Sequence, residues 1–205
     1  MFFGAKTPKI FQALFPTLVW EKSTTEKKVW LTFDDGPTPK ITPFVLDTLL
    51  FYNVKATFFC LGKQVLKHPE ILQRIKAEGH SIGNHSYSHP NGFTTCTKKY
   101  LEDVKKCQEI IPETKLFRPP FGNIYPWQIS KLKKEYKIIM WNVVGWDFDK
   151  NTTKEKCLLN VVNNVGSGSI ILLHDNEKAQ ENLQYALPKI IEALKERRFA
   201  FSATW

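Results

Sequence analysis

Short apolar runs alternate with longer segments of helical period from Val29 to the end of the chain, and this alternation limits the fold more than any other feature. Seven runs predict buried strands, at residues 29–33, 56–59, 81–83, 116–117, 138–141, 170–173 and 199–201. Six segments predict helices, at residues 42–51, 69–78, 98–111, 127–136, 153–164 and 181–197. The alternation is typical of repeated β/α units around a parallel sheet, so the fold class is α/β, either a barrel or a doubly wound open sheet.

Two local signals mark the ends of predicted helices. Gly79 directly follows Glu78 and is an expected helix stop, because glycine readily adopts the left-handed backbone that ends helices. Thr42 is the expected cap of the helix at 42–51. Pro43 suits the first turn of that helix, where the amide proton that proline lacks would have no partner.

The length and composition predict a single domain. A chain of 205 residues, 42% of them hydrophobic, can bury one full core, and no internal repeat or linker divides it. Residues 29–205 are the expected domain, and residues 1–28 are expected to form a strap packed on it, with a membrane-surface anchor as the alternative. Polar residues interrupt the apolar N-terminal stretch, and no apolar run reaches about 18 residues, so neither a signal peptide nor a membrane span is predicted.

The charge of the chain says little about its partner. A formal net charge of +9 could attract an anion. The lysines are nevertheless scattered over predicted amphipathic helices, whose solvent-exposed faces usually carry charged residues. Examples are Lys98, Lys99, Lys105 and Lys106. No compact basic run with interleaved aromatic residues occurs, so we expect no nucleic-acid partner. Association with a membrane surface is not indicated, and a monomer is expected.

The cysteines predict free thiols. No Cys-x-x-Cys pair occurs, and the four residues are widely spaced: Cys60, Cys96, Cys107 and Cys157. Reduced thiols weakly disfavour a secreted domain held by disulfides but are compatible with a periplasmic setting. The location is left open, with the cytoplasm slightly favoured because no clear signal peptide or membrane span is predicted.

Polar residues repeatedly follow the predicted strands. In a β/α barrel the reactive groups gather at the carboxyl ends of the strands, because the loops there converge on one face. The residues in that position are Asp34, Asp35, His85, Arg118, Asp147 and His174. This repeated placement favours the barrel over the open sheet.

Three segments carry candidate chemistry. Asp34 and Asp35 are either part of a simple turn or two carboxylates that divide cation binding and proton transfer between them. His85 and His89 are four residues apart, a spacing that brings both imidazoles onto one metal if the segment makes a helical turn. With a carboxylate beside them they would hold a catalytic metal, zinc first, with cobalt, iron or nickel as alternatives.

Two further strand ends complete the set. His174 ends an apolar strand and is either a capping histidine or an acid that protonates a departing amine. Arg118 lies in the segment Arg118-Pro-Pro-Phe-Gly122, which is either a rigid surface loop or a device that orients a carboxylate through charge-assisted hydrogen bonds.

With these motifs in order, the chain resembles the polysaccharide deacetylase family, the NodB-homology domain of carbohydrate esterases. The segments that carry the resemblance are Thr32-Phe-Asp-Asp-Gly-Pro37, His85-Ser-Tyr-Ser-His89, Arg118-Pro-Pro-Phe-Gly122 and Leu172-Leu-His174. The resemblance covers roughly Val29 to the C-terminus. It implies a distorted (β/α)7 barrel and a metal-dependent hydrolase that removes an N-acyl group, commonly acetyl, from an amino sugar in a glycan such as peptidoglycan or a chitin-like oligomer.

The resemblance also implies a role for each residue. Asp35, His85 and His89 would ligate the metal. Asp34 would be the general base, oriented by Arg118, and His174 the general acid. The backbone N–H of Phe121 would stabilise the oxyanion, and Leu172 would form the wall of the pocket for the acyl methyl group.

The chain departs from the family pattern at two places. Val144-Gly-Trp-Asp147-Phe148 stands where the family often has Asp-x-x-Asp-Trp, so Asp147 is left to tune His174 or to brace Arg118. Phe121 replaces a frequent tyrosine, which should change substrate contacts more than the chemistry. Sugar stacking is a candidate role for Trp127 and Trp146, and core packing is favoured for Trp141.

Two alternatives stay open at this point. One is a noncatalytic carbohydrate-binding barrel, against which the presence of both a base and an opposed acid speaks. The other is a hydrolase of a different amide, such as a lipid-linked formamido sugar. The sequence does not separate this second alternative from an N-deacetylase.

Overall fold

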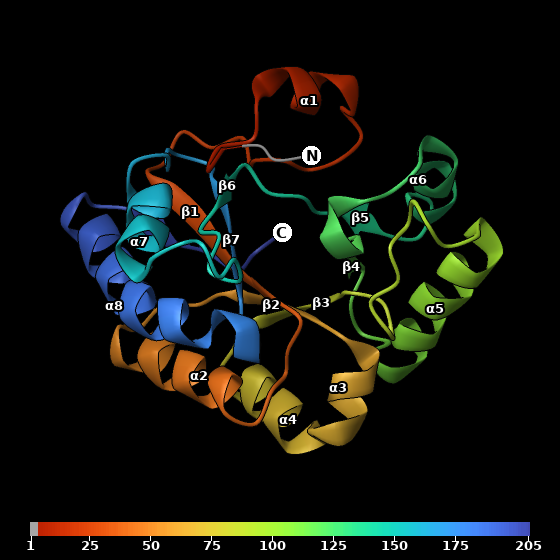
Figure 1. The fold of residues 1–205 in the computed structure, drawn as a ribbon, viewed down its shortest axis with the longest axis horizontal. Helices are drawn as coiled ribbons and strands as arrows, with labels where there is room; N and C mark the ends of the chain where they lie inside the picture. The colour runs from red at the N-terminus through yellow and green to blue at the C-terminus, as the bar shows by residue number, and fades with distance from the viewer. Residues whose placement is uncertain (1–3) are drawn as a thin grey trace.

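A curled sheet of parallel strands forms the centre of the computed structural model, which describes residues 4–205. Its strands are β1 (Lys28–Asp34), β2 (Thr57–Cys60), β3 (Ser81–Asn84), β4 (Leu116–Phe117), β5 (Lys137–Ile138), β6 (Val143–Val144), β7 (Ile170–His174) and β8 (Ala200–Phe201). Seven strands follow the order β5-β4-β3-β2-β1-β7-β6, and β8 pairs with the start of β1. The sheet is open between β5 and β6 (Figure 1). The predicted α/β barrel-like fold is therefore confirmed, as an incomplete barrel.

Helices surround the outside of this sheet (Figure 1). They are α1 (Lys9–Leu14), α2 (Ile41–Phe51), α3 (Gly62–Lys67), α4 (Pro69–Ala77), α5 (Thr97–Ile110), α6 (Pro126–Leu132), α7 (Lys154–Val162) and α8 (Gln180–Glu196), with 3-10 turns η1 (Pro120–Gly122) and η2 (Glu177–Ala179). The largest core cluster joins β1 and β7 to α2 and α8 through fully buried side chains such as Phe33, Ile171 and Leu187. Burying these apolar faces is what holds the helices on the sheet.

Several predicted boundaries were wrong for identifiable reasons. The helix α3 was not predicted, because six residues are too few to show a helical period. The predicted strand at 138–141 is replaced by β5 and β6, since the apolar run through Val144 gives no alternation that marks where one strand ends. The helix predicted at 127–136 ends at Leu132.

The two predicted helix ends had different outcomes. Gly79 has φ +75° just after α4, as expected of a glycine that ends a helix. Thr42 is not a cap, because α2 begins at Ile41. The Thr42 hydroxyl instead donates a hydrogen bond to Asp175 Oδ2 (2.6 Å).

The N-terminal segment lies across the opening of the sheet. The Thr7 N–H donates to the carbonyl of Asn142 beside β6 (2.9 Å), and the Val19 N–H donates to the carbonyl of Ile138 in β5 (2.9 Å). The segment therefore occupies both edge strands with backbone hydrogen bonds. Of the predicted strap, residues 1–3 lie outside the described residues, and the domain boundary at residue 28 stays a prediction.

The sequence predicted no membrane span and four free cysteines, and both predictions can be compared with the residues that the structure describes. Between residues 4 and 205, the helices are all too short or too polar to cross a bilayer. All four cysteines are free thiols, with Cys96 exposed and the other three buried.

Candidate active site

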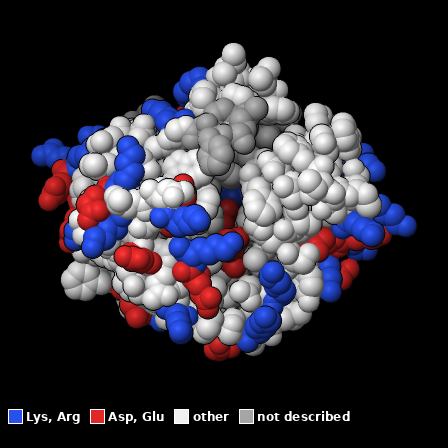
Figure 2. Space-filling model, viewed as in Figure 1, with Lys and Arg blue, Asp and Glu red and all other residues white. Residues whose placement is uncertain are grey.

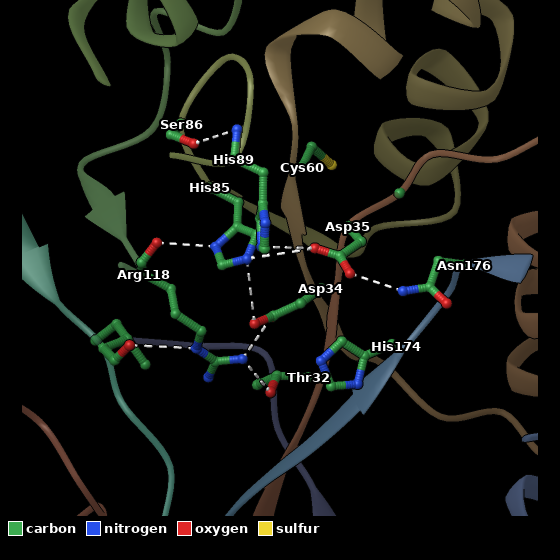
Figure 3. Close-up of polar contacts among 12 residues, drawn as sticks. Thr32, Asp34, Asp35, Cys60, His85, Ser86, His89, Arg118, His174 and Asn176 are labelled. Atoms are coloured by element: carbon green, nitrogen blue, oxygen red, sulfur yellow. Dashed lines mark hydrogen bonds and ion pairs between the residues drawn. The ribbon is translucent and has the colours of Figure 1, made fainter. Parts of the chain in front are cut away.

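The candidate residues meet at the carboxyl ends of the strands, as the alternation of strands and polar residues predicted. Asp34 is the last residue of β1, His174 the last of β7, and Arg118 follows β4. Asp147 follows β6, a strand that was not predicted. Figure 3 shows Asp34 and Asp35 between the His85–His89 pair on one side and His174 on the other. Residues that are distant in the sequence thus form one constellation.

Asp35, His85 and His89 form a candidate metal centre, each offering a ligand atom within 4.8 Å of the others. Asp35 Oδ1 lies 3.5 Å from His85 Nε2 and 3.2 Å from His89 Nε2. That oxygen is buried, yet no hydrogen bond within residues 4–205 satisfies it. A buried carboxylate oxygen facing two imidazole nitrogens is an arrangement that a divalent cation satisfies.

Neighbouring groups orient the candidate ligands and set their protonation states. His85 Nδ1 donates to the carbonyl oxygen of Arg118 (2.8 Å), which leaves the lone pair on Nε2, the nitrogen that faces Asp35. Burial lowers the pKa of His85, which favours its neutral form. Asn176 Nδ2 donates to Asp35 Oδ2 (2.7 Å) and fixes that carboxylate. Burial raises the pKa of Asp35, but contact with His89 and the nearby imidazole charges outweigh it and hold the pKa well below its usual range.

The His85–His89 segment is a tight loop, so the helical turn that the spacing suggested is wrong. Ser86 and His89 both have positive φ, at 70° and 68°. The His89 N–H donates to Ser86 Oγ (3.1 Å), and the Ser86 N–H donates to Asn84 Oδ1 (2.8 Å). The loop still brings the two imidazole centroids to 5.1 Å. The two histidines therefore come together as predicted, although the backbone between them is a loop and not the helical turn that their spacing suggested.

Asp34 is held by a buried arginine. Arg118 is fully buried, and its Nη1 donates to Asp34 Oδ1 (2.7 Å) and to Thr32 Oγ1 (2.8 Å). The other guanidinium donors reach the carbonyl oxygens of Ile139 (3.2 Å) and Met140 (3.0 Å). The second Asp34 oxygen, Oδ2, lies 3.6 Å from His85 Nε2. The ion pair fixes one oxygen of Asp34 and leaves the other directed at the candidate metal centre.

His174 is held by Asp147 on the opposite side of the site. Asp147 Oδ2 accepts from the His174 backbone N–H (2.6 Å), and Oδ1 lies 3.0 Å from the ring Nδ1. Burial by itself lowers the pKa of His174, but the charge and hydrogen bond of Asp147 outweigh it and raise the pKa to about 9. The imidazolium is therefore the form expected at neutral pH. Of the two roles open to Asp147, contact with His174 is the one the geometry favours.

The remaining predicted residues lie near these groups, some exposed and one buried. Phe121 is 59% exposed with φ +59°, and its ring centroid is 4.4 Å from that of His89. Leu172 is buried two residues before His174 on β7 and so shares its side of the strand. Trp146 and Phe148 contribute to a cavity of about 540 Å³, and the Phe148 ring lies 4.6 Å from His174. The roles of these residues stay predictions.

Trp141 packs against two small apolar clusters, and its ring lies 5.7 Å from the Arg118 guanidinium carbon. Core packing was the favoured role for this residue. Its contact with Arg118 was not foreseen.

Sequence reasoning missed the residues that support the two carboxylates. Asp175 Oδ1 accepts from the Gly36 N–H (3.0 Å), and a Cβ on Gly36 would lie 1.9 Å from Asp175 Oδ2. Burial raises the pKa of Asp175 to about 7. Together with Asn176 it anchors the loop after β1 to the end of β7. The only available signal was adjacency to His174, which carries no information about a loop 139 residues away.

The constellation has the parts that amide hydrolysis requires. A carboxylate, Asp34, and an imidazolium, His174, lie beside a candidate cation centre, and each is fixed by its own charged partner. Such a pair can remove a proton from a water molecule and supply one to a departing amine.

Comparisons with known proteins agree with this geometry. Residues 21–139 match the family model described as polysaccharide deacetylase. A peptidoglycan-N-acetylglucosamine deacetylase of Bacillus cereus is 36% identical over 194 residues, which cover 90% of this chain and 89% of that protein. The peptidoglycan-N-acetylmuramic acid deacetylase PdaC of Bacillus subtilis is 36% identical over 179 residues, 85% of this chain but 37% of PdaC. The crystal structure of the Bc1960 peptidoglycan N-acetylglucosamine deacetylase superposes with a TM-score of 0.87 at 36% identity, covering 94% of this chain and 93% of that one.

Proposed function

Because this chain belongs to the polysaccharide deacetylase family, we propose that it hydrolyses the N-acetyl group of an amino sugar in a glycan, with peptidoglycan as the first candidate. The relatives named above act on N-acetylglucosamine or N-acetylmuramic acid of peptidoglycan by their names, and they support this substrate class. The products would be a free amine on the sugar and acetate.

A divalent metal fits the Asp35, His85 and His89 side chains, and zinc is the proposed ion, with cobalt, iron and nickel as alternatives. Two imidazole nitrogens and one carboxylate oxygen are a ligand set typical of catalytic zinc with open positions. When bound, such an ion supplies Lewis-acid polarisation and a water of lowered pKa.

The protein's own groups would handle the protons. Asp34, oriented by Arg118, accepts a proton from the attacking water, and His174 donates one to the amine nitrogen as the carbon–nitrogen bond breaks. The backbone N–H of Phe121 would stabilise the oxyanion of the substrate, and Leu172 would contact the acyl methyl group. Asp147 would keep His174 protonated until His174 donates its proton to the leaving amine.

One observation carries the proposal: the Asp34 carboxylate and the His174 imidazolium lie together beside one candidate metal centre (Figure 3), and each has its own charged partner, Arg118 and Asp147 respectively. A barrel that only bound carbohydrate would require neither the Asp34–Arg118 pair nor the His174–Asp147 pair. The noncatalytic alternative is therefore disfavoured.

Measurement of the released acids tests this function. Purified protein loaded with zinc is incubated with N-acetylglucosamine oligomers, with peptidoglycan and with an N-formyl amino sugar, and acetate and formate are quantified. Release of acetate from the first two is expected. Formate alone would favour the deformylase alternative, and no release of either acid with bound metal would favour the noncatalytic barrel.

Removal of a metal ligand should remove the metal. We expect His89→Ala to weaken metal affinity by at least the 10- to 100-fold that loss of an outer-shell partner typically costs. His89 is partly exposed, so the truncation leaves little buried cavity. Metal content after dialysis against a weak chelator measures the effect. The control is His174→Ala, which removes a nearby imidazole outside the ligand set and should keep its metal; equal loss from both variants would contradict the assignment.

The alkaline limit of activity should depend on Asp147. Below a pKa of about 9 His174 is protonated and can act as an acid, so kcat/KM should fall as pH rises through that value. Asp147→Asn removes the charge that raises this pKa, and the alkaline limb should move to lower pH. A pH–rate profile of both proteins checks this. An unmoved alkaline limb would show that another group sets it.

A further inference from the structure

Three aromatic side chains contact one another in a row at the surface beside the site. The Tyr125 and Trp127 rings are 4.3 Å apart and nearly parallel, at 14°, and Phe93 lies 4.9 Å from Tyr125. Phe93 is 48% exposed and Trp127 is 52% exposed. We call these three residues the aromatic platform. Large apolar faces left in water together are unusual on a soluble domain and commonly mark a binding surface.

Hydrogen bonds hold the platform rigid. Trp127 Nε1 donates to Thr97 Oγ1 (3.0 Å), which fixes the indole on the start of α5. The Gln128 side chain accepts from the Tyr125 N–H (2.9 Å) and donates to the carbonyl of Gly92 (3.1 Å). The Phe93 loop and the start of α6 are thus fixed to each other, so a ligand would meet a preformed surface with little ordering cost.

The platform is continuous with the candidate active site. His89 and Phe93 are four residues apart on one loop, and Phe121 and Tyr125 are four apart on the other. Four residues span at most about 14 Å of extended chain. Phe121 itself contacts the His89 ring. Both loops therefore lead directly from the metal centre to the platform.

The two loops that carry the platform contain no Lys, Arg, Asp or Glu. They are residues 88–97 and 119–130, whereas charged residues make up 24% of the chain as a whole. Figure 2 shows this as a white area beside the central hollow, on the side where Figure 1 places α6. A surface of this kind does not attract an anionic chain. It suits the apolar faces of neutral sugar rings, whose hydroxyl groups can meet polar groups such as the Asn91 and Asn123 amides.

We propose that the aromatic platform binds neutral sugar rings of the glycan chain that flank the amino sugar in the site. The inference rests on the proposed function, and it adds which surface of this chain would bind the sugar rings outside the site. A longer chain would gain affinity from residues that take no part in the reaction, so kcat/KM should rise with chain length.

The dependence of rate on chain length tests the proposal. Deacetylation of N-acetylglucosamine dimers to hexamers is measured for the parent, Trp127→Ala and Phe93→Ala. Each variant should keep the parent's kcat/KM on the dimer and lose roughly 10-fold on the hexamer. Phe51→Ala is the matched control, since Phe51 is an 81% exposed aromatic residue at the end of α2. Parent-like rates of both platform variants on every oligomer would overturn the proposal.

A binding measurement separates this inference from the proposed function. Titration calorimetry with the hexamer is carried out on metal-loaded protein bearing Asp34→Asn, with and without Phe93→Ala. Weaker hexamer binding on loss of Phe93 supports the platform even if no oligomer is ever deacetylated. Equal binding by both proteins, together with acetate release by the parent, would keep the function and reject the platform.

Discussion

Replacing Asp34 by asparagine is expected to lower turnover by about 10²- to 10⁴-fold while the metal stays bound. The carboxamide has the shape of the carboxylate but cannot accept a proton from water. Asp34 also lies outside the Asp35, His85 and His89 ligand set, and its oxygen Oδ1 is already occupied by Arg118. Loss of turnover without loss of metal would therefore identify a base and separate its role from that of a ligand.

Three measurements make this result interpretable. Acetate release gives turnover, elemental analysis gives metal content, and denaturant unfolding shows whether the fold survives removal of a buried charge. Asp47→Asn is the control, because Asp47 is an exposed carboxylate that also pairs with an arginine, Arg74. An Asp34→Asn enzyme as active as the parent would remove the base from the mechanism.

The site was predictable from the sequence to the extent that it lies on strand ends. Asp34, Arg118 and His174 each follow a buried apolar run, and parallel strands place their carboxyl ends on one face. The same reasoning does not predict the backbone conformation of the loops after the strands. It assumed a helical turn for His85 and His89, where positive φ values in a tight loop bring the rings together instead.

The contacts between distant loops were beyond sequence reasoning. Asn176 reaches Asp35 across 141 residues, and Asp175 reaches Gly36 across 139. Neither periodicity nor a local motif predicts which two loops will meet, because that depends on which strands are neighbours in the sheet, as β1 and β7 are here. The choice between the two roles offered for Asp147 required coordinates for the same reason.

Arg118→Met should destabilise the fold by about 3–5 kcal/mol, the cost typical of removing one partner from a buried ion pair. Arg118 is fully buried and Asp34 is 3% exposed, so water cannot replace the lost donor. Methionine is an unbranched apolar side chain that can fill much of the space of the arginine, whose guanidinium carbon lies 4.0 Å from the centroid of the Phe59 ring. Denaturant unfolding at constant metal loading measures the change. Stability equal to the parent would mean that the pair serves only to orient Asp34.

A double-mutant cycle shows how much of that cost belongs to the pair itself. Arg118→Met leaves a buried carboxylate without its counter-charge. Asp34→Asn leaves a buried guanidinium whose remaining acceptors, Thr32, two backbone carbonyls and the new carboxamide oxygen, are all neutral. The double variant strands neither charge, so its loss of stability should be smaller than the sum of the single losses by roughly 0.5–3 kcal/mol. Additive losses would mean that Thr32 and the carbonyl oxygens hold Arg118 without help from Asp34. In that case the arginine would be a structural cation of the core, and the orientation of the proposed base would need another explanation.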